Sequence, residues 1–245
     1  MSRPEPCSPP IGCASSAERD CIGTAWVDAL PYLQRVPLLS NIIVYDAHSG
    51  DDAKATSGST IRRLLGGLTN VNYLIERSPG DRYVLRVPGV GTAEYINRRN
   101  EKICAQMTSA ILVNAPVLFF DEADGLMLTR YLEGSVTMSA ALFSSDLSSV
   151  GRAGQVLRRL HRNAGPFPSD FKLFTTIDDY ERLLLSKTGQ TSLPDGYHVL
   201  RDSVEGLRGV LQQLSIAHVP SHCDPLCENF LDVGKHDKLS SSIHG

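Results

Sequence analysis

Residues 222–229 read His-Cys-Asp-Pro-Leu-Cys-Glu-Asn, and the interpretation of the whole chain starts from them. Asp224 and Asn229 stand five positions apart, a spacing that lets both side chains face one phosphate group. The aspartate can then accept the proton of an attacking hydroxyl, and the asparagine can offer a neutral oxygen to a magnesium ion. We therefore expect Asp224 to be the catalytic residue and Asn229 a metal ligand.

Two other interpretations of this stretch stay open. Pro220 and Pro225 could make it a polar surface turn, in which Asp224 and Asn229 serve only turn hydrogen bonds. A zinc site is the second alternative, although a second, distant ligand pair is missing. The side chains with suitable ligand types and short spacings are His218, His222, Cys223 and Cys227.

Upstream, the sequence predicts an antiparallel meander with strands at 61–65, 72–77 and 82–87. The turn between the first two strands combines glycines, which permit close backbone approach, with side chains that can hydrogen-bond phosphate oxygens. A plain hairpin turn is the alternative, because Gly-Gly between strands is a common hairpin signal. The nucleotide contacts expected here come from Gly66, Gly67, Thr69, Asn70 and Asn72.

Arg86 lies in the third of these strands, whose alternation puts it on the same face as Val84. From there a cation could pair the α- and β-phosphates of a nucleotide and be held by a carboxylate of the following helix. That helix is expected at 97–112. The residues along one side of it are Ile103, Met107, Ala110 and Ile111. Glu101 is the best placed carboxylate and Glu94 the second. The alternative is a solvated arginine on an edge strand.

The remaining pattern predicts an α+β chain with a strand-rich first half and a helical second half. A short helix is expected at 25–39, limited by Pro31 and Pro37, and a linker at 49–59. Further strands are expected at 117–121 and 126–132, and helices at 148–163, 177–186 and 202–214.

In a two-lobed chain we expect a small-molecule site in the cleft between the lobes. The strand that leads into the lobe junction includes Arg130 and Leu132, whose backbone groups could hold an adenine edge. The expected division is an N-terminal extension with helix and linker at 1–60, a nucleotide-binding lobe with its hinge at 61–133, and a helical lobe with the catalytic loop at 134–245.

The composition and charge of the chain argue against nucleic-acid binding and membrane insertion. With 42% hydrophobic residues among 245, the chain can build a real core, and a net charge of -3 offers no broad attraction to nucleic acid or an anionic membrane. No apolar run approaches the roughly 20 residues that span a bilayer, and residues 1–21 lack a signal-peptide core. We expect a cytoplasmic protein with six reduced cysteines, and nothing in the sequence predicts an oligomeric state.

In order, these motifs resemble the choline/ethanolamine kinase and aminoglycoside phosphotransferase superfamily over roughly residues 61–232. The resemblance implies a protein-kinase-like two-lobed fold, ATP and Mg²⁺ as cofactors, and phosphorylation of a small hydroxyl substrate, choline- or ethanolamine-like. It also implies the roles given above for Asp224, Asn229, Arg86 and Glu101. The stretches that carry it are 64–73, 83–89, 98–101, 131–134, 157–161 and 221–232.

The sequence departs from this superfamily after Asp232. Members continue into a second metal-binding aspartate within an Ile/Val-Asp-Trp/Phe-Glu-like stretch, whereas this sequence offers only Asp237 in a polar stretch before it stops at Gly245. We therefore expect a chain truncated at its C-terminus, with magnesium weakly held and transfer impaired. The alternative function is that of a catalytically inactive nucleotide-binding relic or an interaction protein.

Overall fold

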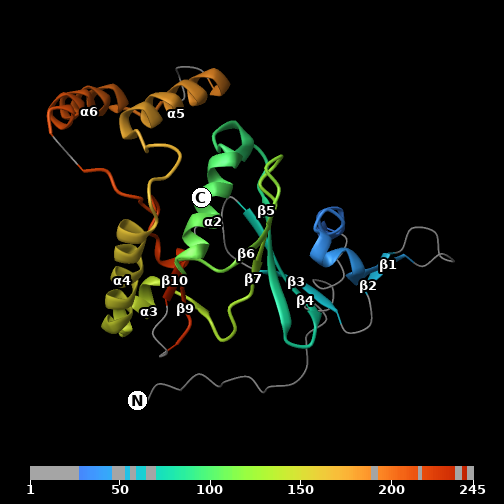
Figure 1. The fold of residues 1–245 in the computed structure, drawn as a ribbon. Coiled ribbons are helices and arrows are strands. Elements are labelled where there is room, and N and C mark those ends of the chain that lie inside the picture. The colour runs from blue at the N-terminus through green and yellow to red at the C-terminus, as the bar shows by residue number, and fades with distance from the viewer. Residues whose placement is uncertain are drawn as a thin grey trace, which may run out of the picture.

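A computed structural model describes residues 28–45, 53–55, 59–64, 70–188, 193–214, 217–234 and 239–241. Its centre is an antiparallel sheet of five strands in the order β3-β4-β5-β7-β6. In Figure 1 this sheet stands between the N-terminal segment, in blue, and helix α2. The strands are β3 (Thr60–Leu64), β4 (Asn70–Ser78), β5 (Asp81–Pro88), β6 (Val117–Phe120) and β7 (Met127–Arg130).

The predicted meander is confirmed, because β3 pairs with β4 and β4 with β5 in antiparallel register. Residues of one face of the sheet form the main core, including Tyr83, Leu85 and Leu128, each at most 1% exposed. The N-terminal segment covers this face with Leu33 and Leu39, both fully buried. Burying a leucine side chain contributes about 1.5–3 kcal/mol, so this cover stabilises the sheet substantially.

The N-terminal segment differs from the single helix expected at 25–39. It forms a helical stretch at 28–33 and then the 3-10 helix η1 (Pro37–Ile42). Pro37 explains the break, because it lacks an N–H donor and disfavours helical backbone at the residue before it. The linker expected at 49–59 is also wrong in part, since β2 (Ala53–Ala55) pairs with β1 (Ile43–Tyr45).

Helix α2 (Arg98–Ala110) begins where the sequence predicts, after Asn97, whose side chain accepts a hydrogen bond from the Asn100 N–H at 3.0 Å. Its expected apolar side is wrong. Ile103 and Met107 are only partly buried, and the buried positions of the helix are Arg98, Ala105 and Thr108. The helix therefore turns a partly polar side inward, and this side carries the charged groups described below.

In the helical half, the strand that follows residues 222–229 packs against helix α4 (Leu147–Asn163). This helix buries Ser149, Ala153, Val156 and Leu160, spaced by three and four residues as one helical face requires. Their cluster includes Phe230 of the strand that follows the loop. The other elements are β8 (Val136–Thr137), α3 (Ala140–Ser145), η4 (Cys227–Asn229), β9 (Phe230–Asp232) and β10 (Leu239–Ser241).

Helices α5 (Leu173–Thr188) and α6 (Tyr197–Gln212) form a pair at the top of Figure 1. Neither has a buried residue, and ion pairs join them, such as Arg208 to Asp178 at 2.9 Å. Helix α5 also reaches the segment before α2, where Lys187 Nζ lies 2.5 Å from Glu94. None of the helices in the described part of the chain is long and apolar enough to cross a membrane.

Arg35 ties the N-terminal segment to the turn after β6. Its guanidinium donates to the Asp124 carboxylate at 2.7 and 2.9 Å and also to Asp121. These hydrogen bonds hold the pKa of both carboxyls below their ordinary value of 3.8. A carboxyl whose pKa is lowered on folding stabilises the fold above its unfolded pKa, and that contribution is lost as the pH falls through the folded pKa.

We therefore expect Arg35→Gln to lower the melting temperature at pH 6, and the gap from wild type to close as the pH falls below about 4. The loss at pH 6 should be modest, on the order of 1 kcal/mol, because all three side chains are about a third exposed. Thermal unfolding of both proteins between pH 2.5 and 6 checks this. A gap that stays constant over that range would contradict the assignment.

Candidate active site

Arg86 is a buried cation on an internal strand. It lies on β5, between β4 and β7, so the alternative of a solvated edge-strand arginine is wrong. Its side chain is 3% exposed, and Nη2 donates to Glu101 Oε1 of α2. Glu94 pairs with Lys187 instead. The structure thus brings together Arg86 and Glu101, the first of the two carboxylates expected.

Glu101 also binds a second arginine to which the sequence analysis gave no role. Arg98 Nη1 lies 2.7 Å from Glu101 Oε2, and Arg98 is 7% exposed. Its Nη2 donates to the Thr92 hydroxyl. The available signal was the i,i+3 spacing from Arg98 to Glu101, which places both on one side of a helix. Two buried guanidinium groups share one carboxylate, so this cluster carries a surplus positive charge.

The turn predicted to contact the nucleotide is only partly described. Gly66, Gly67 and Thr69 lie outside the described residues, whereas Asn70 and Asn72 belong to β4. Asn72 is the cross-strand partner of Arg86, so the two side chains share one face of the sheet. Its Oδ1 is buried and has no hydrogen-bond partner within the described part of the chain. An acceptor and a cation therefore lie side by side on this face of the sheet.

The Arg130 side chain points away from Arg86. Its guanidinium lies over the Tyr83 ring, 4.9 Å from the centroid, and 3.0 Å from Asp81. Tyr83 belongs to the core face of the sheet, and alternation puts Arg86 on the opposite face. The Arg130 N–H donates to the Pro116 carbonyl at 3.0 Å. The expected backbone contact to an adenine edge therefore falls to the Arg130 carbonyl, and for Arg130 as for Leu132 it stays a prediction.

Asp224 and Asn229 lie together in the loop before β9. Asn229 Nδ2 donates to the Asp224 backbone carbonyl at 2.8 Å and to Asp224 Oδ2 at 3.2 Å. Asp224 is exposed and Asn229 is 9% exposed. His222, 8% exposed, stacks on Phe230 with ring centroids 6.2 Å apart. The surface-turn alternative accounts for the hydrogen bonds but not for the burial of Asn229 and His222.

The backbone just before Asp224 is strained. Cys223 has φ 65°, in the left-handed region that residues other than glycine rarely adopt. Such conformations cost about 1–3 kcal/mol and persist where the surrounding structure enforces them, often at active sites. Here the buried His222 on one side and the hydrogen-bonded Asn229 on the other hold the loop. The carboxylate of Asp224 is thereby presented outward.

An electrostatic interaction relates α2 to the loop. The half-buried thiol of Cys104 on α2 has a pKa raised above its ordinary value of 9.0, mainly by burial, and Cys223 and Glu101 raise it further. Glu101 of α2 and Cys223 of the loop therefore act on the same thiol.

The zinc alternative is wrong for the residues proposed. His218 is 74% exposed and lies 3.9 Å from Asp170, while His222 is stacked in the core. Across the described segments, no group of three or more His, Cys, Asp or Glu side chains could hold a metal ion.

Magnesium requires a different set of donors. It commonly uses one or two carboxylates and completes its shell with phosphate oxygens and water. Asn229 directs Nδ2 at Asp224, which leaves its Oδ1 to face an ion. An amide oxygen and a carboxylate, which lie side by side here, are donors of the type that magnesium binds. Asp237 lies outside the described residues.

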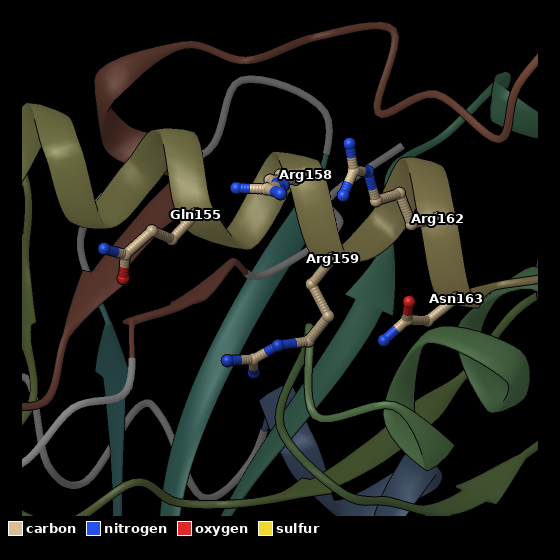
Figure 2. A pocket seen from close by; sticks show the side chains of 5 residues that line it. All are labelled: Gln155, Arg158, Arg159, Arg162 and Asn163. Carbon is tan, nitrogen blue, oxygen red and sulfur yellow. The ribbon is translucent and has the colours of Figure 1, made fainter.

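Two hollows lie on the helical half. The first, of about 250 Å³, is lined by residues of α4, and Figure 2 shows its three arginines, Arg158, Arg159 and Arg162, projecting from that helix. Arg159 there donates to the Leu112 carbonyl at 3.0 Å and so ties α4 to the end of α2. The second, of about 450 Å³, borders the catalytic loop through Ser221 and Cys223. Its other walls include Phe167, Asp170 and Phe171.

Comparison with known proteins agrees with this geometry. Residues 60–236, more than half of the chain, match the model of the phosphotransferase enzyme family. The chain is similar to a choline/ethanolamine kinase family protein from Mesorhizobium loti, with 36% identity and a TM-score of 0.65, over 88% of this chain and 63% of that one. The choline kinase LicA from Streptococcus pneumoniae shares the fold, with 24% identity and a TM-score of 0.62, over 74% and 61% of the two chains.

Among curated proteins, the chain is 34% identical over 126 residues to Protein LicA from Haemophilus influenzae, and the match covers 51% of this chain and 36% of LicA. The chain therefore spans less than two thirds of the length of the relatives it matches. The α+β, protein-kinase-like fold expected from the sequence is confirmed. With a family match over most of its length, the chain belongs to the phosphotransferase enzyme family.

Proposed function

We propose that this chain is an ATP-dependent phosphotransferase that acts on the hydroxyl of a small, choline- or ethanolamine-like amino alcohol. The observation that carries the proposal is the buried ion pair of Arg86 and Glu101, together with the exposed Asp224 carboxylate that Asn229 holds in its loop. A buried cation that can pair phosphates and a carboxylate that can accept a proton are groups that phosphoryl transfer uses. The family match supports the same reaction class.

In this proposal the sheet binds the nucleotide. Arg86 pairs the α- and β-phosphates, and the amide nitrogen of Asn72 beside it donates a hydrogen bond to a phosphate oxygen. The glycines and Thr69 of the preceding turn contact the phosphates, together with Asn70. The Leu132 N–H meets the adenine edge, since its carbonyl already accepts a hydrogen bond from Ser135 at 3.2 Å. LicA, a structural relative, is known in complex with AMP.

Asp224 is the residue that accepts the proton of the acceptor hydroxyl. As that proton leaves, the hydroxyl oxygen forms a bond to the γ-phosphorus while the bond from phosphorus to the bridging β-γ oxygen breaks, with ADP as the leaving group. Asn229 would hold magnesium through Oδ1, and the ion supplies positive charge to the phosphate oxygens when it is bound. Asn229 also keeps the Asp224 carboxylate in place through Nδ2.

The hollow beside the catalytic loop is the proposed acceptor site. Phe167 and Phe171 offer aromatic faces to a quaternary or primary ammonium group, and Asp170 offers a carboxylate. The solved relatives bear the names of choline and ethanolamine kinases, which supports an acceptor of this class. The same proposal includes the division into a nucleotide-binding lobe at 61–133 and a catalytic lobe from 134, in a cytoplasmic protein.

A second candidate function is nucleotide binding without transfer. It is favoured by the donor set of the metal site, where the described residues offer one amide oxygen and one carboxylate. A weakly held ion would leave the γ-phosphoryl group without charge neutralisation. Arg86 and the sheet would still bind the nucleotide.

The test is transfer from ATP with magnesium to choline, ethanolamine and an aminoglycoside, followed by phosphorus NMR of the acceptor. We expect phosphocholine or phosphoethanolamine from wild type and none from Asp224→Ala. If no acceptor is phosphorylated but ATP still binds, and binds equally with and without magnesium, the second candidate replaces the first. If ATP does not bind, both are wrong.

A further inference from the structure

Arg98 lies in a buried charged cluster with Glu101 and Arg86. Glu101 accepts from Arg86 at Oε1 and from Arg98 at Oε2, so each carboxylate oxygen has its own guanidinium. The side chains are 3%, 7% and 13% exposed for Arg86, Arg98 and Glu101. Two cations against one carboxylate leave the cluster with one surplus positive charge, in a place where water screens it poorly.

The position of Arg98 is fixed from three sides. Its backbone is in the first turn of α2, and its Nη2 donates to the Thr92 hydroxyl. On the third side stands Gly125, with φ 91° and a Cα so close that an added Cβ would lie 2.8 Å from the Arg98 guanidinium. Only glycine fits both this backbone conformation and this approach.

Gly125 also links the two arginines. Its carbonyl accepts from Arg86 Nη2 at 3.4 Å, while its Cα borders Arg98. Its N–H donates to the Asp121 carbonyl at 2.8 Å, which fixes the turn. The turn after β6 therefore sets the spacing between the two guanidinium groups around the Glu101 carboxylate.

A glutamate side chain has several rotatable bonds, and one hydrogen bond from Arg86 would leave its carboxylate free to rotate about the last of them. The second hydrogen bond, from Arg98, fixes the plane of the carboxylate. Arginine suits this task because its guanidinium is a rigid planar fork. A fixed carboxylate in turn fixes the guanidinium of Arg86.

We propose that Arg98 is a positioning residue that holds the Glu101 carboxylate so that Arg86 is presented to the nucleotide phosphates, with Gly125 as the spacer that admits its guanidinium. This inference rests on the proposed function, since it requires that Arg86 meets phosphates. If Arg98 served only to join α2 to the turn after β6, its loss would lower stability and leave the recognition of phosphates unchanged.

The experiment compares the affinities of the full chain for ATP and adenosine by calorimetry. The variants are Arg98→Met, Arg98→Lys and the control Arg99→Met, which removes the same type of side chain from an exposed position one residue further along α2. We expect Arg98→Met to weaken ATP binding about tenfold and to leave adenosine binding unchanged. Arg99→Met should change neither.

Arg98→Lys keeps the positive charge of Arg98 but not its planar shape, so it distinguishes the effect of orientation from that of charge. It also keeps a cation in the buried site and therefore replaces Arg98→Met if that variant fails to fold. Lysine cannot reproduce the fork, so we expect only partial recovery of ATP affinity. Full recovery would mean that charge alone matters and would overturn the positioning role. Equal losses for ATP and adenosine, or an unchanged ATP affinity in Arg98→Met, would overturn it too.

The affinities of wild type distinguish a failure of the role of Arg98 from a failure of the proposed function. If wild type prefers ATP and Arg98→Met keeps that preference, only the role of Arg98 is contradicted. A wild type that binds adenosine as tightly as ATP contradicts phosphate recognition by Arg86, and the inference falls with the proposed function.

Discussion

Asp224→Asn should lower kcat about 100- to 10,000-fold while the affinity for ATP stays the same. A general base contributes this much to proton transfer, and asparagine has nearly the same shape but cannot accept the proton. The Asn229 hydrogen bonds to the Asp224 backbone carbonyl and side-chain oxygen can persist in the variant, so the loop keeps its geometry. Steady-state kinetics with saturating ATP and varied acceptor, together with calorimetry for ATP, measures both quantities.

The control is Asp202→Asn, the same chemical change at an exposed carboxylate on α6. It should leave kcat unchanged. If Asp224→Asn kept more than about a tenth of the wild-type kcat, proton acceptance by Asp224 would contribute less than general-base catalysis requires, and its catalytic role would be wrong.

Glu101→Gln should destabilise the fold by about 3–5 kcal/mol, because it leaves two buried guanidinium groups without their carboxylate. Arg86 and Arg98 have side chains that are 3% and 7% exposed, so water cannot replace the lost partner. For a chain of this size the melting temperature should fall by roughly 6–20 °C. Thermal unfolding and urea titration both report the loss.

The matched control is Glu122→Gln, whose carboxylate pairs with Lys102 at 2.7 Å with both side chains about a third or more exposed. Pairs of this kind contribute about 0–1 kcal/mol. If the two variants lost similar stability, the charged cluster around Glu101 would not be the buried network described here. Addition of ATP should partly restore the melting temperature of Glu101→Gln, since an anion can take the place of the lost charge beside the arginines.

The parts of the site that follow from local periodicity were predictable. Strand alternation put Arg86 on the same face as Val84, and the helix after it supplied Glu101. The five-residue spacing in the loop predicted that Asp224 and Asn229 act together, and the structure brings the two side chains into contact. In these cases neighbouring residues in one element, or two consecutive elements, determine the geometry.

What depends on contacts between distant segments was missed. The position of the Arg130 side chain follows from pairing with Tyr83 on another strand, which puts the guanidinium on the core face. The inward side of α2 was misjudged because apolar periodicity favours Ile103 and Met107, whereas the Arg98 guanidinium packs against Gly125 in the turn after β6. The short strands β8, β9 and β10 have too few residues to show alternation.

The most direct test of the central claim, that the buried Arg86 recognises nucleotide phosphates, is the affinity of wild type and Arg86→Met for ATP and for adenosine. We expect wild type to bind ATP about 10- to 100-fold more tightly than adenosine, because of charge-assisted hydrogen bonds to phosphate. In Arg86→Met this preference should disappear while adenosine still binds. A wild type without preference for ATP, or a variant that keeps it, would contradict the claim.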